Sequence, residues 1–196
     1  EEFVTCEPFD IPNHWFVING MDFGWDHPQS QVQLVWDKDT DTFYVTRSWK
    51  QRHTSPNEAW GAVKKWAATV PTAWPHDGLQ TEKGSGKQQK NYYEEAGFKM
   101  CTKHATWQDG ANGVEAGLFE IRDLMQKGKF KIFVGQRDLF DEFGQYHRDS
   151  NGKIAKTMDD ILDAIRYAYM MRRYAIQYAD IGTVKKARKL NFSSRL

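Results

Sequence analysis

The stretch from residue 16 to residue 50 constrains the fold more than any other part of the chain. It begins with the apolar, β-branched run FVINGMDFGW, which is typical of a central strand. The next run, QVQLVWDKDTDTFYVTRSWK, alternates apolar and polar residues on both sides of an acidic turn, which predicts a hairpin. Together they predict a three-stranded antiparallel meander, so the chain is built on a β-sheet.

Helical and strand-like segments alternate after this meander. Ser55, Pro56 and Glu58 form the pattern of a capping box with proline at the first helical position. The segments that we expect after it are a helix (55–70), a strand (72–78), a helix (91–98), a strand (99–107), a helix (112–128), a strand (129–134), a helix (136–146), a hairpin at Asn151-Gly152 and a last helix (about 158–178). This order predicts an α/β fold with a mixed central sheet flanked by helices.

Composition excludes several classes of protein. The chain has 196 residues, 40% of them hydrophobic and 14% aromatic, which indicates one globular domain with a real core. The formal net charge of +1 gives no general nucleic-acid signal, and no apolar run approaches the roughly 18 residues of a membrane span. Cys6 and Cys101 match no disulfide or zinc framework, so we expect a reducing, cytosolic setting without a membrane.

The two ends differ from the middle. Residues 1–14 are polar and contain proline, and we interpret them as a linker that precedes a domain over 15–178. Residues 179–196 form a tail, and its end, VKKARKLNFSSRL, carries five Lys or Arg and no acid. Lys185, Lys186 and Arg188 in this tail are candidate DNA-binding residues.

The last predicted helix carries three acids in its first turns, at positions 159, 160 and 163. With Thr157 as the N-cap, acids at this end favour the helix dipole by roughly 0.3–1 kcal/mol each. Capping explains Asp159 and Asp160 well. It explains Asp163 poorly, because that residue lies two turns in and borders the stripe of Ile161, Ala164, Ile165, Ala168 and Tyr169 that we expect to be buried.

Two further acids stand out. Asp22 interrupts an apolar strand, so it either faces solvent at the strand end or is compensated by a cation. Asp77 precedes Gly78 after a short strand, which is ordinary turn chemistry. Taken singly, neither residue identifies a site.

The loop GSGK (84–87) does not complete a phosphate-binding P-loop, since position 81 is Thr and position 88 is Gln. We therefore expect no ATP site in this chain. Lys83, Lys87 and Lys90 either contact a phosphate backbone or belong to a solvated flexible loop. No zinc spacing and no nucleophile motif such as G-x-S-x-G is present.

Three stretches carry a family resemblance in the right order. PNHWFVINGMDFGWDHP, WPHDG and KTMDDILDAIRYA resemble the ribonuclease H-like C-terminal nuclease domain of the large terminase subunit of tailed bacteriophages. The resemblance covers roughly residues 10–178. It implies a mixed sheet of about five strands flanked by helices, with an extra β-hairpin before the last helix. The family's other half, an ATPase motor, would precede the predicted linker.

The resemblance also implies a metal-dependent endonuclease that cuts concatemeric viral double-stranded DNA during genome packaging. Asp22, Asp77 and Asp163 match the family's catalytic acids, and Asp160 matches a further ligand position, whereas Asp159 matches none. Clustered carboxylates suit Mg²⁺ or Mn²⁺, and two such ions about 3.5–4 Å apart can hydrolyse a phosphodiester. The implied partners are DNA, the portal protein, the small terminase subunit and the ATPase domain of the same chain, in the host cytoplasm and transiently at the procapsid.

Other functions remain open from the residues alone. A junction resolvase or a transposase-like nuclease would share the fold, and a non-catalytic DNA-docking or portal-docking module would use the basic tail and the GSGK loop while the acids only cap and turn. A regulatory hypothesis concerns the hairpin at Asn151-Gly152, which directly precedes the acid-bearing helix and would gate access to it.

Overall fold

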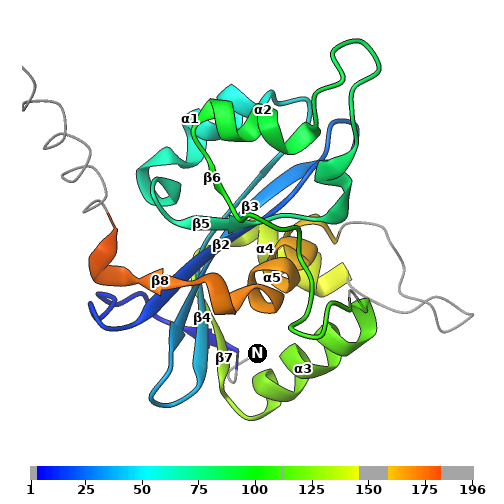
Figure 1. The fold of residues 1–196 in the computed structure, drawn as a ribbon. Coiled ribbons are helices and arrows are strands. Elements are labelled where there is room, and N and C mark those ends of the chain that lie inside the picture. Colours follow the sequence, from blue (N-terminus) through cyan, green and yellow to red (C-terminus); the bar gives the residue numbers. More distant parts are fainter. Residues whose placement is uncertain (1–3, 112, 146–158, 182–196) are drawn as a thin grey trace, which may run out of the picture.

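The computed structural model describes residues 4–111, 113–145 and 159–181. Within them lies an eight-stranded sheet in the order β1-β7-β4-β3-β2-β5-β6, with β8 also paired to β2 (Figure 1). The strands are β1 (Thr5–Cys6), β2 (Phe16–Asp22), β3 (Gln29–Asp37), β4 (Thr42–Gln51), β5 (Pro71–Ala73), β6 (Lys99–Met100), β7 (Phe130–Phe133) and β8 (Ile176–Gln177).

The sheet is mixed, as the alternation in the sequence predicts. The strands β2, β3 and β4 form the antiparallel meander, and β5 pairs in parallel with β2 on one side. On the other side β7 pairs in parallel with β4. Because β2 and β5 run the same way, their carboxyl ends reach the same edge of the sheet.

Helices cover both faces of this sheet. They are α1 (Pro56–Ala67), α2 (Gln89–Ala96), α3 (Val114–Gln126), α4 (Arg137–Gln145) and α5 (Asp160–Met170), with short 3-10 helices η1 (His76–Leu79), η2 (Arg172–Tyr174) and η3 (Tyr178–Asp180). Figure 1 shows α1 and α2 side by side and α5 lying across β2. The predicted capping box of Ser55 and Glu58 starts α1.

Two adjacent residues of β2, Asn19 and Gly20, show which helix packs on which face of the sheet. Asn19 Nδ2 donates to the carbonyl of Ala67, 3.4 Å away, at the end of α1. Gly20 faces the backbone of α5, where an added Cβ would lie only 2.0 Å from the carbonyl oxygen of Ala164. Since successive strand side chains point to opposite faces, α1 and α5 lie on opposite sides of β2. The predicted stripe of α5, namely Ile161, Ala164, Ile165, Ala168 and Tyr169, is buried.

The structure differs from the sequence prediction at both ends of the domain. Within residues 1–14, which we expected to be a linker, Thr5–Cys6 pairs in parallel with β7. Phe9 also packs its ring 5.0 Å from that of Phe133 and 5.3 Å from that of Tyr44. These apolar contacts make the segment part of the fold, so the folded unit begins before residue 15.

The last helix is shorter than predicted. It ends at Met170 rather than near residue 178, because the chain turns through η2 and then pairs as β8 with the start of β2. The strand expected over 99–107 is likewise reduced to Lys99–Met100. The hairpin at Asn151-Gly152 and the basic end of the tail lie outside the described residues. In the part of the chain that the structure describes, none of the helices has the length and apolarity to cross a membrane.

Candidate metal-binding site

Asp22 is the last residue of β2, at the edge where the carboxyl ends of β2 and β5 meet. The close approach of α5 to Gly20, two residues earlier, brings the first turns of that helix beside this strand end. A glycine is required there because any side chain would meet the backbone of the helix. The local sequence NGMD thus combines a contact point for α5 at Gly20 with an acid two residues after it.

The pKa of Asp22 is raised well above its usual range. Burial is the largest cause, followed by the negative charges of Asp163 and then Asp160, while Arg166 partly opposes them. The structure therefore brings three of the predicted acids into one electrostatic neighbourhood. Without a compensating cation this arrangement disfavours the ionised form of Asp22.

Asp163 is tied to Arg166, one turn later on α5. The Nε and Nη2 atoms of Arg166 both donate to Asp163 Oδ1, at 3.2 and 2.9 Å. Arg166 is itself buried, with its guanidinium over the Tyr167 ring at 4.5 Å. Sequence reasoning missed this residue, although an arginine three positions after an acid on a helix is a recognisable pairing signal.

Asp160 is the first residue of α5 and is buried. Its backbone carbonyl accepts a hydrogen bond of 2.7 Å from Ser30 Oγ on β3, opposite Asp22 in the sheet. Burial raises the pKa of the Asp160 carboxyl, against the charges of Lys50 and His27. The residue therefore borders both the strand end and the loop that joins β2 to β3.

Asp159 lies at the start of the last helix, where the sequence predicted an acid that favours the helix dipole. Asp159 occupies the N-cap position but makes no side-chain capping hydrogen bond, and Thr157 lies outside the described residues. Instead Glu142, on α4, accepts hydrogen bonds from the backbone nitrogens of Ile161 and Leu162, at 2.9 and 3.2 Å. An acid at a helix N-terminus is favourable, but this one comes from another helix and no local motif reveals it.

Glu142 is completely buried and its charge is compensated by Lys50. Lys50 Nζ, at the end of β4, lies 2.8 Å from Glu142 Oε1. Burial raises the pKa of Glu142, whereas Lys50 and the two backbone donors lower it. The Glu142–Lys50 pair thus holds the start of α5, which carries Asp160 and Asp163, against β4 and α4.

Asp77 lies apart from this group. It is exposed on η1, which follows β5, and its carbonyl accepts the hydrogen bond that closes the turn at Gln80. Its charge is not among those that shift the pKa of Asp22. It does share a surface groove with Phe23, the residue directly after Asp22.

The donor chemistry fits a divalent cation, but the described residues do not complete a coordination sphere. Within those residues, no three His, Cys, Asp or Glu side chains are grouped closely enough to hold a metal ion. Asp22, Asp160 and Asp163 nevertheless supply only oxygen donors and an excess of negative charge. Such a set suits Mg²⁺ or Mn²⁺.

The lysines of the GSGK loop are partly engaged. Lys87 pairs with Glu95 and lies over the Tyr92 ring, and Lys90 lies 3.4 Å from Glu94. Lys83 is exposed. Lys185, Lys186 and Arg188 belong to the part of the tail that the structure does not describe.

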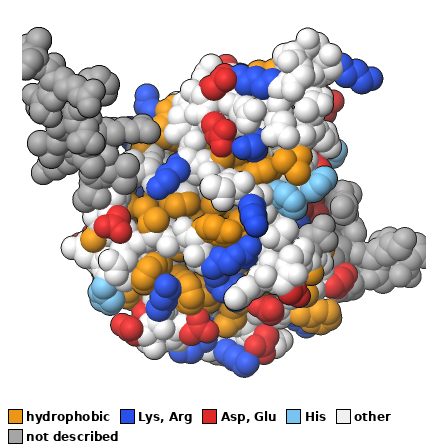
Figure 2. Space-filling model, viewed as in Figure 1, with side chains coloured by type: hydrophobic (Ala, Val, Ile, Leu, Met, Phe, Trp, Pro, Cys, Tyr) orange, Lys and Arg blue, Asp and Glu red, His pale blue; other side chains and the backbone are white. Residues whose placement is uncertain are grey.

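Other basic side chains lie just after α5. Arg173 Nη1 donates to the carbonyls of Thr106 and Met170, at 2.8 and 2.9 Å, and Arg172 lies over the Tyr169 ring. Figure 2 shows Lys and Arg side chains among hydrophobic ones in the middle of the face between α5 and β8. This surface was not predicted, because η2 falls inside the helix that the sequence suggested.

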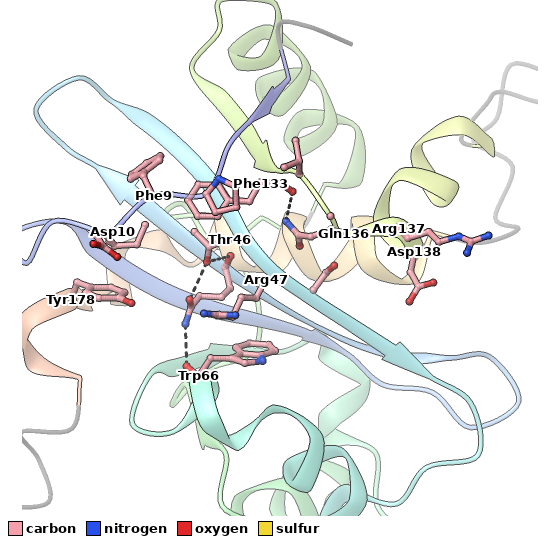
Figure 3. A pocket seen from close by; sticks show the side chains of 16 residues that line it. Phe9, Asp10, Thr46, Arg47, Trp66, Phe133, Gln136, Arg137, Asp138 and Tyr178 are labelled. Carbon is pink, nitrogen blue, oxygen red and sulfur yellow. Dashed lines mark hydrogen bonds between the residues drawn. The ribbon is translucent and has the colours of Figure 1, made fainter.

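A larger hollow of about 880 Å³ lies elsewhere, between the N-terminal segment, β4 and the start of α4 (Figure 3). Inside it, Thr46 Oγ1 donates to Gln33 Oε1 at 2.9 Å, and Gln33 Nε2 donates to the Trp66 carbonyl at 3.0 Å. None of the four predicted metal ligands is among its described lining residues. The size of a hollow therefore does not identify the acidic site.

Comparison with known proteins adds independent information. Residues 19–172 match the family model described as Terminase RNaseH-like domain. The chain is 55% identical over 186 residues to the large terminase subunit of Salmonella phage P22, which is 95% of this chain and 37% of that protein. It therefore spans little more than a third of that relative's length.

Two solved structures share its architecture. The nuclease domain of the P22 large terminase superimposes with a TM-score of 0.88 at 55% identity, over 93% of this chain and 94% of that one. The nuclease domain of the large terminase of bacteriophage SPP1, solved with bound Mn, superimposes with a TM-score of 0.53 at 19% identity, over 78% and 84% of the two chains. The second likeness shows a shared fold.

Proposed function

This chain belongs to the terminase RNase H-like domain family, and from that premise we propose that it is the endonuclease that cuts concatemeric viral double-stranded DNA during genome packaging. Its ribonuclease H-like fold confirms the fold that we predicted from the sequence. Within the same proposal, its partners are an ATPase domain in the rest of the full-length protein, the portal protein and the small terminase subunit. We also propose that it acts in the host cytoplasm and transiently at the procapsid.

The observation that carries this proposal is the placement of Asp22 against the first turns of α5. Asp22 is a half-buried acid whose pKa is raised first by burial and then by the charges of Asp163, Asp160 and Asp159. This arrangement is costly, and a bound cation would relieve it. In our proposal Asp22 and Asp163 are metal ligands and catalytic residues. Asp160 is an additional ligand, and Asp77 is a catalytic acid that holds a second ion on the η1 side.

One or two Mg²⁺ or Mn²⁺ ions would supply Lewis-acid chemistry for phosphodiester hydrolysis when bound. The chain's own residues provide the oxygen donors and the orientation. Arg166 holds one oxygen of Asp163, and the Glu142–Lys50 pair fixes the helix end that carries Asp160 and Asp163. The Mn reported in the SPP1 nuclease domain supports the choice of metal.

The test is plasmid cleavage by the 196-residue chain with Mn²⁺, with Mg²⁺ or with EDTA. We expect weak cutting without sequence preference that requires the metal. Asp22→Asn, Asp77→Asn and Asp163→Asn should each abolish it, whereas Asp159→Asn should retain much more activity than Asp163→Asn. Asp138→Asn, at an exposed acid on α4, is the matched control.

Three results would count against the proposal. Cleavage by the three variants at the wild-type rate would overturn the assignment of the site. Preference for branched DNA over plain duplex would favour a junction resolvase. Metal-independent DNA binding without any cleavage would favour a docking module.

A further inference from the structure

A groove of about 530 Å³ is lined in part by Asp77, and the other residues described on its lining have no role in the proposal above. It lies between the loop that follows β2, the start of α1, η1 and the start of α2. Its lining includes Phe23, Trp25, Asp77, Gln80, Gln89 and Tyr92. Aromatic and amide side chains therefore dominate the walls.

Trp25 is held in an exposed position in this groove. Its side chain is 58% exposed, although tryptophan is usually highly buried. The backbone nitrogen of His53 donates to the Trp25 carbonyl at 3.1 Å, and the His53 ring packs edge-on against the indole with centroids 5.7 Å apart. The indole is thus presented to solvent on a fixed backbone.

The loop itself is tightly wound. An added Cβ at Gly24 would lie 2.4 Å from the carbonyl oxygen of His27 and 2.6 Å from that of Pro28. The Phe23 ring packs 4.9 Å from the ring of Tyr93. These contacts hold in place the two residues that directly precede Trp25.

The charges of the groove disfavour a phosphate. The acids on its lining are Asp77 and Glu82, and Tyr92 and Ser85 donate hydrogen bonds to the Glu82 carboxylate. Where no cation is bound, these two carboxylates would repel a phosphate, whereas an uncharged aromatic ring would not be repelled. Gln80 and Gln89 carry amide groups that match the hydrogen-bonding edge of a nucleobase.

The groove adjoins the acidic site through the same loop. Phe23 directly follows Asp22, and His27 lies close enough to Asp160 for its charge to act on that carboxyl. Asp77 lines the groove itself. A DNA strand whose phosphate lies at Asp77 would therefore pass along the groove that Trp25 also lines.

We propose that this groove receives an unstacked nucleobase next to the phosphate being cut, and that Trp25 is the surface on which the base stacks. The inference rests on the proposed nuclease function. Stacking on an aromatic side chain tolerates any base, since every base has a π-face. It also favours locally opened DNA over intact duplex.

The experiment compares binding of two fluorescein-labelled DNA duplexes to the 196-residue chain in EDTA, by fluorescence anisotropy. One duplex is fully paired, and the other contains a three-nucleotide mismatch bubble. Trp25→Ala should weaken binding of the bubble duplex roughly tenfold and leave the paired duplex almost unchanged. Trp25→Phe should keep most of the preference, and Phe119→Ala, which removes a 61% exposed aromatic on α3, should behave as wild type.

Equal affinity of Trp25→Ala and wild type for the bubble duplex would overturn the inference. So would the same loss in Phe119→Ala, because the effect would then not belong to the groove. Plasmid cleavage with Mn²⁺ separates the two proposals. Metal-dependent cutting with no bubble effect removes only the inference about the groove. A bubble effect without any metal-dependent cutting removes the nuclease function and leaves base stacking on Trp25 without a phosphate to cut.

Discussion

Asp22 is a half-buried carboxyl whose pKa is raised by burial and by the charges of Asp163, Asp160 and Asp159, so we expect its ionised form to reduce the stability of the metal-free protein. Its folded-state pKa lies above its usual value near 3.8, so the folded protein binds this proton more tightly than the unfolded chain does. The contribution of Asp22 to stability is therefore present below about pH 4 and is lost as the pH rises towards the folded-state pKa.

Asp22→Asn should consequently melt at a higher temperature than wild type at pH 7 in EDTA, and this difference should shrink towards pH 4. A gain of 1 kcal/mol would correspond to a shift of roughly 2–4 °C for a chain of this size. Thermal unfolding followed by circular dichroism measures it. Adding Mn²⁺ should raise the melting temperature of wild type and not of Asp22→Asn. A lower melting temperature for the variant in EDTA would show that Asp22 is not under repulsion.

Glu142 acts on the acids through the helix that carries them. Replacing it with Gln removes the ion pair to Lys50 and leaves one oxygen for which Lys50 and the backbone nitrogens of α5 compete. We expect Glu142→Gln to lower the cleavage rate roughly 10–100-fold, as for other residues that orient metal ligands, while the affinity for DNA stays near wild type. Cleavage kinetics and anisotropy measure the two effects.

The matched control is Glu120→Gln. Glu120 accepts a hydrogen bond of 2.9 Å from the hydroxyl of Tyr169, near the other end of the same helix. It should leave the cleavage rate close to wild type. If both variants lose activity equally, the effect reports the stability of α5 rather than the position of its first turn.

Gly20 shows how one element positions another. The contact of α5 with β2 depends on the absence of a side chain there, because a Cβ would overlap the Ala164 carbonyl. Gly20→Ala should destabilise the protein by at least the roughly 1–3 kcal/mol typical of overpacking and should reduce cleavage, since the helix must move away from Asp22. Urea unfolding and plasmid cleavage check both outcomes.

Gly61→Ala is the matched control within a helix. Nothing lies within 4 Å of a Cβ added at Gly61 on α1, so the substitution should be neutral or should stabilise by about 0.5–1 kcal/mol. Equal stability of the two alanine variants would contradict the close packing of α5 on β2.

Elements with a local signal could be predicted from the sequence, and elements made by long-range pairing could not. The capping box at Ser55 and the meander of β2, β3 and β4 are confirmed, because turn and cap chemistry is local. Strands of two residues such as β1, β6 and β8 exist only through their partners in the sheet. For the same reason the sequence indicated the acids of the last helix but not Glu142, which lies 19 residues before the backbone nitrogen of Ile161 that it binds.

The molecule places Asp22, Asp160 and Asp163 together near one edge of the sheet, while its net charge is only +1. Under the proposed function, DNA affinity would come from basic residues outside the acidic site, and the tail carries five Lys or Arg between residues 182 and 196. Lys87 and Lys90 contribute less in our view, because each already pairs with a glutamate.

Ending the chain after residue 181 should therefore weaken DNA binding without lowering the melting temperature. If all five basic residues contact phosphates, the slope of log affinity against log salt should become less steep by roughly 4 to 5, since each contact contributes about 0.9. Anisotropy titrations from low to moderate salt measure the slope for the full chain and the shortened one. Replacing only Lys83, the exposed lysine of the GSGK loop, should change the slope by at most about one. An unchanged slope in the shortened chain would show that the tail does not contact DNA and would move the binding surface to the arginines that follow α5.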